Sequence, residues 1–196
     1  MNENHELCAS PEWRTHVQTT VLPAVLAEVD LGDDLLEVGP GYGATTDWLR
    51  NRVDRLTVVE VDGDLAGPLE RRYAGSNVRV VRGDATEMDF DDARFSAGVS
   101  FFMLHHVPSP EAQDRLFAEV ARVLAPGAPF VAVDSLHSDD LEAWHVGDTF
   151  NPIDPDGLAT RLVAAGMVEP EVQMHPDAGW IAHARMPTLS RDRAGR

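Results

Sequence analysis

Leu35-Leu36-Glu37-Val38-Gly39-Pro40-Gly41-Tyr42-Gly43 is an apolar run that breaks into three glycines within five residues. The residues that follow, 44–53, have helical spacing, so the stretch predicts a strand, a glycine-rich turn and a helix in that order. Such a turn presents bare backbone N–H groups and a helix N-terminus to a ligand, because glycine reaches positive φ at little cost and has no Cβ. The stretch therefore predicts a nucleotide or nucleoside site at the end of the strand.

The length of 196 residues predicts one domain with a full hydrophobic core over about residues 10–187 and a disordered tail over 188–196. No segment approaches the roughly 18 apolar residues of a membrane span. The polar, acidic first residues do not resemble a signal or transit peptide. A single cysteine, Cys8, fits a reducing compartment, so we expect a cytoplasmic protein without a membrane partner.

The composition is strongly acidic, with a formal net charge of −17, and all sixteen basic residues are arginines. So acidic a surface is expected to repel phosphate backbones, which argues against DNA or RNA as a partner and leaves a small-molecule acceptor. The simpler interpretation of the charge is solubility. Nothing in the sequence indicates an oligomeric state.

The rest of the chain alternates between apolar runs and helical periodicity. Strands are expected over 35–38, 56–61, 78–81, 95–102 and 130–133, followed by a late strand pair over 168–174 and 180–185. Helices are expected over 11–26, with a bend near Pro23, and over 44–53, 65–73, 110–124 and 155–166. This order is typical of an α/β fold with a doubly wound, mostly parallel sheet and helices on both faces.

In such sheets ligands bind beyond the carboxyl ends of the strands. Glu60 ends the strand after the glycine turn, about twenty residues on, where an acid can accept hydrogen bonds from both ribose hydroxyls. A nicotinamide-binding site would show the same pattern, and Gly39, Gly41 and Ala44 satisfy the looser G-x-G-x-x-A fingerprint.

Further motifs distinguish a nicotinamide-binding site from other sites that hold a ribose. They are Glu37–Gly43, Val59-Glu60-Val61-Asp62, Gly83-Asp84-Ala85, Phe102-Met103-Leu104-His105-His106-Val107 and Ala121–Gly127. Together these motifs resemble the class I S-adenosylmethionine-dependent methyltransferases, in particular the small-molecule, type 11-like group, over about residues 10–187. The resemblance implies a seven-stranded sheet in the order 3-2-1-4-5-7-6 with an antiparallel last strand. It also implies S-adenosylmethionine as cofactor and S-adenosylhomocysteine as product.

The resemblance assigns the cofactor-binding residues as well. The backbone of Gly39, Pro40 and Gly41 would pass the methionine part of the cofactor, and Glu37 occupies the acidic position before the glycines.

The adenosine part would be held by residues at the next two strand ends. Glu60 would hold the ribose, with Val61 packing against adenine. Asp84 would accept from the adenine amino group and the Ala85 N–H would serve a ring nitrogen.

The end of the fourth expected strand departs from several subfamilies. Main chain near Ser100 and Phe101 would border the methionine end of the cofactor. Where those subfamilies carry an acid or an Asn/Asp-Pro-Pro-Tyr motif, this chain has Ser100-Phe101-Phe102-Met103. That difference counts against methylation of amino groups on bases and glutamine.

Candidate catalytic residues follow the same strand. His105 and His106 could act as a general base if the acceptor arrives protonated, since imidazole titrates near neutral pH. Alternatively, one or both only bond to local backbone. Asp134 and His137 form a second candidate pair for contact with substrate. The spacing of these four residues is not diagnostic of a metal site, and none is expected.

An acceptor pocket could be lined by Trp13, Trp144 and Phe150, although each could equally belong to the core. The segment 134–152 is nineteen residues long, lacks a regular apolar period and follows a strand at the ligand edge. We expect it to close over the acceptor with the Trp13 helix and to exclude water.

Three functions remain open on the sequence. The first is methyl transfer to a small acceptor, such as a metabolite, a quinone-like compound or a natural product. The second is an S-adenosylmethionine-binding protein of the same fold with lost or different chemistry. The third, a nicotinamide-dependent oxidoreductase, is disfavoured by the absence of lysine, and hence of any Tyr-x-x-x-Lys pair, and by the late strand pair.

Overall fold

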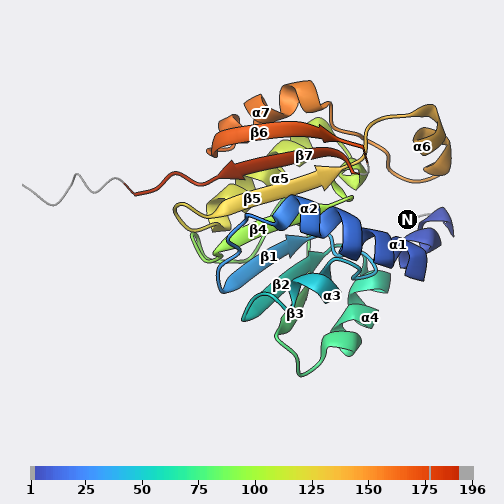
Figure 1. The fold of residues 1–196 in the computed structure, drawn as a ribbon, viewed down its shortest axis with the longest axis horizontal. Coiled ribbons are helices and arrows are strands. Elements are labelled where there is room, and N and C mark those ends of the chain that lie inside the picture. Colours follow the sequence, from blue (N-terminus) through green and yellow to red (C-terminus); the bar gives the residue numbers. More distant parts are fainter. Residues whose placement is uncertain (1–2, 177, 190–196) are drawn as a thin grey trace, which may run out of the picture.

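A computed structural model describes residues 3–176 and 178–189, which form one seven-stranded sheet with helices on both faces (Figure 1). The strand order is β3-β2-β1-β4-β5-β7-β6, so the predicted fold class and order are confirmed. The strands are β1 Asp34–Val38, β2 Arg55–Glu60, β3 Val78–Arg82, β4 Ala97–Phe101, β5 Pro129–Asp134, β6 Val168–His175 and β7 Gly179–Arg185.

The first five strands are parallel, and their carboxyl ends meet at one edge of the sheet. Within the pairing, Leu36 lies opposite Thr57 of β2 and Gly98 of β4. β7 runs antiparallel to both β5 and β6, as the late strand pair predicts. In Figure 1 the N-terminal residues, α1 and α6 lie beyond the arrowheads of the parallel strands. These segments are therefore placed to cover a ligand at that edge.

The structure contains seven α-helices in its described residues. They are α1 Pro11–His16, α2 Leu22–Leu26, α3 Thr46–Leu49, α4 Gly63–Tyr73, α5 Pro110–Val123, α6 Asp139–Trp144 and α7 Pro155–Ala164. Five of them, α2, α3, α4, α5 and α7, pack on the two faces of the sheet. Apolar residues of α2, α3 and α4 pack in one core, whereas those of α5 and α7 pack in the other. Strand β1 serves both cores, because Leu35 enters the first and Leu36 the second.

The expected first helix is divided by a π-helical turn, Val17–Val21, in which the Leu22 N–H bonds to the Val17 carbonyl. Pro23 follows directly and has no N–H to donate to the turn before it. The predicted irregularity near Pro23 thus takes the form of a change in helical winding.

Two regions differ from the elements expected of them. The helix expected over 44–53 is regular only at α3. Gly43, just before it, has a φ of +78° that a right-handed helix does not contain, and the hydroxyls of Thr45 and Thr46 bond to Glu37 of β1. The segment 134–152, expected to be irregular, contains α6, which Ser138 caps by accepting from the Leu141 N–H at 3.2 Å.

The predicted tail over 188–196 falls almost entirely outside the described residues, which end at Leu189. None of the helices formed by the described residues is long and apolar enough to cross a membrane.

Candidate active site

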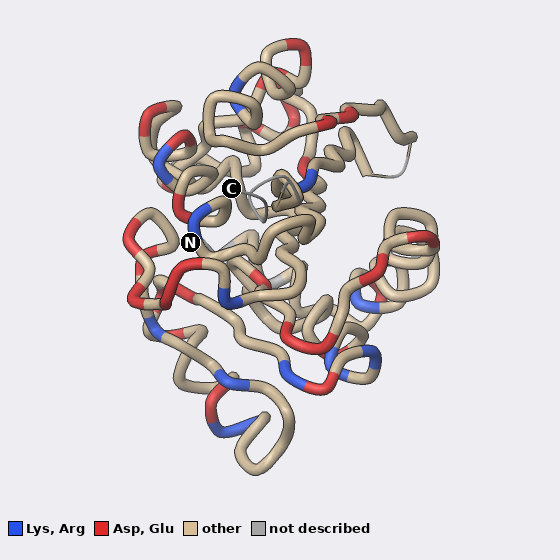
Figure 2. Tube along the Cα trace, turned by 90° about the vertical axis from the view of Figure 1, so that its left-hand side faces the viewer, with Lys and Arg blue, Asp and Glu red and all other residues tan. Residues whose placement is uncertain are grey.

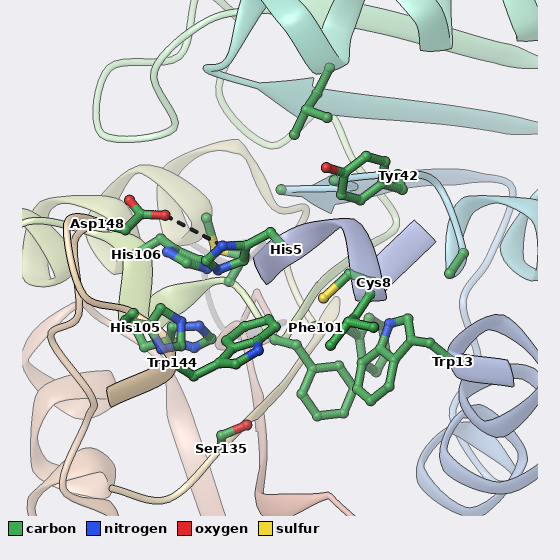
Figure 3. A pocket seen from close by; sticks show the side chains of 18 of the residues that line it. His5, Cys8, Trp13, Tyr42, Phe101, His105, His106, Ser135, Trp144 and Asp148 are labelled. Carbon is green, nitrogen blue, oxygen red and sulfur yellow. Dashed lines mark ion pairs between the residues drawn. The ribbon is translucent and has the colours of Figure 1, made fainter. Parts of the chain in front are cut away.

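A cavity of about 940 Å³ opens at the carboxyl ends of the parallel strands (Figure 3). Its walls come from the N-terminal 3-10 helix Glu3–Ala9, the glycine turn, the ends of β2 and β4, the 3-10 turn Leu104–His106 and the segment after β5. It is large enough to hold a ligand of nucleoside size, since ligand pockets commonly measure about 300 to 1,000 Å³. The position agrees with the rule that doubly wound sheets bind ligands at this edge.

The glycine turn forms one wall of the cavity. Gly39 has φ of +69° and its N–H donates to the Val59 carbonyl at 2.9 Å, which ties the turn to the end of β2. A Cβ on Gly39 would lie 2.6 Å from the side chain of Met103, whereas a Cβ on Gly41 would meet nothing within 4 Å. Gly41 therefore presents open backbone to the cavity.

Glu60 lies beside this turn at the end of β2. The side chain is only 6% exposed, and its carboxylate accepts from the Gly41 N–H at 3.1 Å and from the Asp62 N–H at 3.0 Å. Burial raises the pKa of Glu60, and the bonds from Asp62 and Gly41 oppose that rise. Each carboxylate oxygen has two acceptor positions, so an acceptor remains for a ligand hydroxyl. The open backbone fits the methionine part of S-adenosylmethionine, and the buried acid fits the ribose of its adenosine part.

Glu37 lies under the turn rather than in the cavity wall. It is buried, and its carboxylate accepts from the Thr45 hydroxyl and, at 2.7 Å, from the Thr46 hydroxyl. Burial raises the pKa of Glu37 to about 7, although the two hydroxyl bonds lower it. Glu37 therefore joins the strand end to the start of α3.

The other predicted cofactor residues are divided between the cavity and its surroundings. Val61 and Phe101 line the cavity, and Val61 is 67% exposed. Asp84 and Ala85 follow β3 outside the lining, and Asp84 accepts from the Thr86 N–H at 2.8 Å. Ser100 is buried within β4. The Gly83 N–H donates to the Glu60 carbonyl at 3.0 Å, so the Asp84 loop is held beside the Glu60 end of the cavity.

His105 and Asp134 form a buried pair at the opposite end. The His105 Nδ1 lies 2.6 Å from Asp134 Oδ1, and the His105 backbone N–H donates to Oδ2 at 2.9 Å. The Ser135 N–H donates to Oδ1 as well, at 2.7 Å. An ionised carboxylate only accepts, so the His105 Nδ1 donates this bond, and in the neutral ring Nε2 has a free electron pair. This is the arrangement in which a carboxylate orients a histidine base.

His106 belongs to a group of imidazoles that also contains His5 and His145. The ring centroids of His106 lie 4.8 Å from His5 and 5.2 Å from His145. Burial, together with the neighbouring His105 and His5 rings, lowers the pKa of His106 to about 3. Burial also lowers the pKa of His145. These two rings are therefore neutral at physiological pH.

The predicted acceptor residues are likewise divided. Trp13 and Trp144 line the cavity, on opposite sides in Figure 3. Phe150 is not among the lining residues and stacks on His145 with ring centroids 4.5 Å apart. His137 is also outside the lining, where it approaches Glu142 at 3.4 Å. The segment after β5 does reach the cavity, through Ser135 and seven residues between 138 and 149, but its closure over an acceptor stays a prediction.

Sequence reasoning missed several cavity residues. The polar N-terminal stretch folds as a 3-10 helix and contributes His5, Leu7 and Cys8. His145 was also missed because it occurs singly. The only available signal was the unusual number of histidines, eight in 196 residues. Tyr42 lies within the motif itself, yet its contact with the cavity follows from the shape of the turn.

Comparison with known proteins identifies the family. Residues 36–132 match the family model described as a methyltransferase domain. Two solved structures resemble the chain over 95% of its length. They are a SAM-dependent methyltransferase from Aquifex aeolicus, with a TM-score of 0.74, 16% identity and 100% of that chain covered, and the PH0226 protein from Pyrococcus horikoshii OT3, with a TM-score of 0.77, 18% identity and 99% covered. At these identities the structures show the fold.

The chain belongs to the class I S-adenosylmethionine-dependent methyltransferases, and the predicted family and its cofactor are confirmed.

Curated relatives match only part of the chain. The "Ribosomal RNA small subunit methyltransferase A" of Cupriavidus taiwanensis is 43% identical over 77 residues, which is 38% of this chain and 27% of the relative. A protein of the same name from Moorella thermoacetica is 46% identical over 74 residues. The chain thus spans about a quarter of the length of these relatives.

These relatives correct one prediction. The exclusion of nucleic-acid partners was wrong, because the curated relatives are named as methyltransferases of ribosomal RNA. The exclusion used net charge, which sums the whole chain, whereas contact with a phosphate depends on the local arrangement of charges. Figure 2 shows arginine positions scattered between acidic ones along the trace.

Proposed function

We propose that this protein transfers a methyl group from S-adenosylmethionine to a small-molecule acceptor held in the cavity. The observation that carries the proposal is that one cavity of about 940 Å³ is lined both by the glycine turn with Glu60 and by His105. A cofactor at one end and an acceptor at the other would share a single cavity, which favours their alignment.

On the cofactor side, the backbone of Gly39, Pro40 and Gly41 would face the methionine part and Glu60 would accept from the ribose hydroxyls. The main chain near Ser100 and Phe101 would border the methionine end. When bound, S-adenosylmethionine supplies a methyl group on a positively charged sulfur.

The adenine end is proposed to lie near Val61, Asp84 and Ala85. Val61 is exposed to the cavity, and the bond from Gly83 to the Glu60 carbonyl keeps Asp84 near it. Glu37 would act indirectly, by holding the turn in place through Thr45 and Thr46.

On the acceptor side, His105 is the proposed general base and Asp134 the residue that positions it. Of the two predicted histidines, His105 has the buried carboxylate partner, whereas His106 Nδ1 lies 3.2 Å from the Thr149 carbonyl. A base within reach of the acceptor would remove its proton as the methyl group arrives.

The wall near the acceptor is largely apolar. Trp13 packs edge-on against Phe102 with ring centroids 5.1 Å apart, and Phe102 holds a φ of 55° that non-glycine residues rarely adopt. Trp144 lines the cavity beside His5. An apolar or aromatic acceptor with one ionisable group, such as a quinone-like metabolite or a natural product, fits these walls.

RNA is a second candidate acceptor, favoured by the names of the curated relatives. An RNA acceptor would have to place one base or ribose in the cavity, with the remaining strand outside. The apolar wall around Trp13 could stack a base in that case.

The proposal is tested by calorimetry and by a transfer assay. S-adenosylhomocysteine should bind at one site per chain, and NAD should not bind; the reverse result would overturn the proposal. Labelled methyl groups are then followed from S-adenosylmethionine into separate small-molecule and ribosomal RNA fractions. Label in the small-molecule fraction alone is expected. Label in RNA would favour the second candidate, and cofactor binding without any transfer would indicate a different reaction on the same fold.

Three further predictions from the sequence remain predictions. They are the single domain over 1–196, the cytoplasmic location and the closure of residues 134–152 with the Trp13 helix. Closure would slow hydrogen exchange of 134–152 when S-adenosylhomocysteine and acceptor are both bound.

A further inference from the structure

His5, His106 and His145 meet at one end of the cavity although they come from three separate segments. One potential ligand atom from each lies within 4.8 Å of the others. All three residues line the cavity, and His5 and His106 lie side by side in Figure 3. The three rings therefore border the cavity.

Hydrogen bonds indicate which ring nitrogen carries the proton in two of these histidines. The Nδ1 of His145 lies 2.7 Å from the Leu141 carbonyl, and the Nδ1 of His106 lies 3.2 Å from the Thr149 carbonyl. A carbonyl only accepts, so each Nδ1 carries the proton and each Nε2 carries a free electron pair. Metal-binding histidines are held in this way, with the second ring nitrogen bonded to a carbonyl or carboxylate.

His5 has a comparable outer partner. Its Nδ1 lies 3.6 Å from Asp148 Oδ2, the ion pair drawn as a dashed line in Figure 3. A carboxylate there would orient the ring and raise the basicity of the opposite nitrogen.

The burial of the His145 ring points independently to a ligand at this place. The residue is 2% exposed, and within the described chain its Nε2 is buried without a hydrogen-bond partner. A buried polar atom left in that state is costly and calls for an explanation such as a bound ion.

We propose that His5, His106 and His145 bind one zinc ion and leave a fourth position open to the cavity. Three nitrogen ligands with one open position are typical of catalytic zinc sites, and imidazole suits zinc among the divalent metals. Nitrogens on one tetrahedral zinc ion lie about 3.4 Å apart, given Zn–N bonds of about 2.0 to 2.1 Å. The widest pair, at up to 4.8 Å, would therefore close by roughly an ångström through side-chain rotation.

The open position defines the class of ligand that the ion would take. Water, or an acceptor with an oxygen, nitrogen or sulfur donor, could enter it from the cavity beside His105 and Trp144. The site goes beyond the proposed methyl transfer and does not depend on it. The competing explanation is simple aromatic packing, since the His5 and Trp144 ring centroids lie 4.5 Å apart.

Metal titration separates the two explanations. The full chain, free of any histidine tag and stripped of metal, is titrated with cobalt(II) and followed by visible absorption, and zinc affinity is then obtained by competition. We expect one ion per chain, with the intense absorption of a four-coordinate cobalt site. His5→Phe and His145→Phe keep an aromatic ring but remove a ligand, and each should weaken zinc binding by about 100-fold or more.

His183→Gln is the matched control, because His183 lies on β7 away from the cavity lining. Its zinc affinity should equal that of the native chain. Absence of stoichiometric binding to the native chain, or an unchanged affinity in His145→Phe, would overturn the proposal.

A further variant covers the case in which both phenylalanine variants misfold. Asp148→Asn leaves all three rings in place and should weaken zinc binding by about 10- to 100-fold, as loss of an outer-shell partner does; an unchanged affinity would count against the site. S-adenosylhomocysteine binding is measured separately on the same samples. Its failure would overturn the proposed function and leave the metal result standing.

Discussion

The two ends of the cavity are built in different ways. At the glycine end, the Gly41 N–H bonds to Glu60, nineteen residues later, and the two residues lie at or just after the ends of two neighbouring strands, β1 and β2. At the histidine end, the Asn4 side chain donates to the Trp144 carbonyl across 140 residues of chain. His5, His106 and His145 come together there only because three covering segments meet.

The difference separates what a short stretch of chain determines from what only the assembled fold determines. A glycine turn after a buried strand has a backbone shape that follows from its own residues. The histidine end needs the N-terminal 3-10 helix, the turn after β4 and the segment after β5 to arrive at one place. We therefore expect the glycine end to determine cofactor affinity and the histidine end to determine chemistry and acceptor.

The largest effect is expected from His105→Asn. Asparagine places an N–H near the position of the His105 Nδ1, so the bond to Asp134 can be kept while the proton-accepting Nε2 is lost. Turnover of the acceptor identified in the transfer assay should fall by about 10²- to 10⁴-fold. Calorimetry should find S-adenosylhomocysteine affinity within about threefold of the native value.

His183→Gln serves as control and should keep native turnover. Native turnover in His105→Asn would show that the acceptor loses its proton elsewhere. A parallel loss of turnover and cofactor affinity would show that the two ends are not separate.

The glycine end was predictable because its signals are local. The apolar run Leu35–Val38, the three glycines and Glu60 at the next strand end all follow from period, turn chemistry and spacing. The strand order followed from resemblance and was confirmed. What the sequence could not show is that Glu37 lies beneath the turn, because its bonds from the Thr45 and Thr46 hydroxyls depend on how the chain after the glycines folds back against β1.

The histidine end was predictable only in part, for a physical reason. Adjacent His105 and His106 at a strand end could be recognised, but the pairing of His105 with Asp134 depends on the register of β4 with β5. His5 lies in a polar stretch with no apolar period, and it is held by Asp148 and Trp144 from far along the chain. Such contacts depend on the tertiary structure and produce no periodic hydrophobic pattern in the sequence.

Glu60→Gln tests the glycine end directly. The amide keeps the size of the side chain but offers one acceptor oxygen instead of two, so a bond from Gly41, Asp62 or the ribose is lost. Hydrogen bonds to a charged group contribute about 1.5 to 3 kcal/mol, so S-adenosylhomocysteine affinity should fall by about 10- to 150-fold in calorimetry. Asp64→Asn, a change at an exposed acid of α4, should leave it unaltered. Native affinity in folded Glu60→Gln would remove Glu60 from the site.

Glu37 should make the stability of the glycine end depend on pH. Its pKa is raised to about 7 in the folded chain, so the folded state holds a proton that the unfolded state releases above about pH 4.5. Stability is therefore complete below pH 4.5 and falls as the pH rises through 7, by about 3.5 kcal/mol in all at about 1.4 kcal/mol per pKa unit, of which about 2.5 kcal/mol falls between pH 5 and pH 8. Urea unfolding at pH 5 and pH 8 should show this loss in the native chain and in Glu70→Gln, a change at an exposed acid. Glu37→Gln should lack it, and equal losses in all three proteins would contradict the assignment.

The smallest effect compares two serine caps, one in the core and one over the cavity. Ser109 caps α5 by accepting from the Ala112 N–H at 3.2 Å, and Ser138 caps α6 from Leu141 at the same distance. Removing such a cap costs about 1 kcal/mol of helix stability. Helix α5 buries seven residues whereas α6 buries none, so Ser109→Ala should lower the global free energy of unfolding by about 1 kcal/mol. In Ser138→Ala the loss of helix stability should stay local, because the covering segment opens without unfolding the sheet. Hydrogen exchange in α6 should become about fivefold faster, and the urea midpoint should not change. A shifted midpoint in Ser138→Ala would show that the cover and the core unfold as one unit, and the distinction between the two ends of the cavity would then fail.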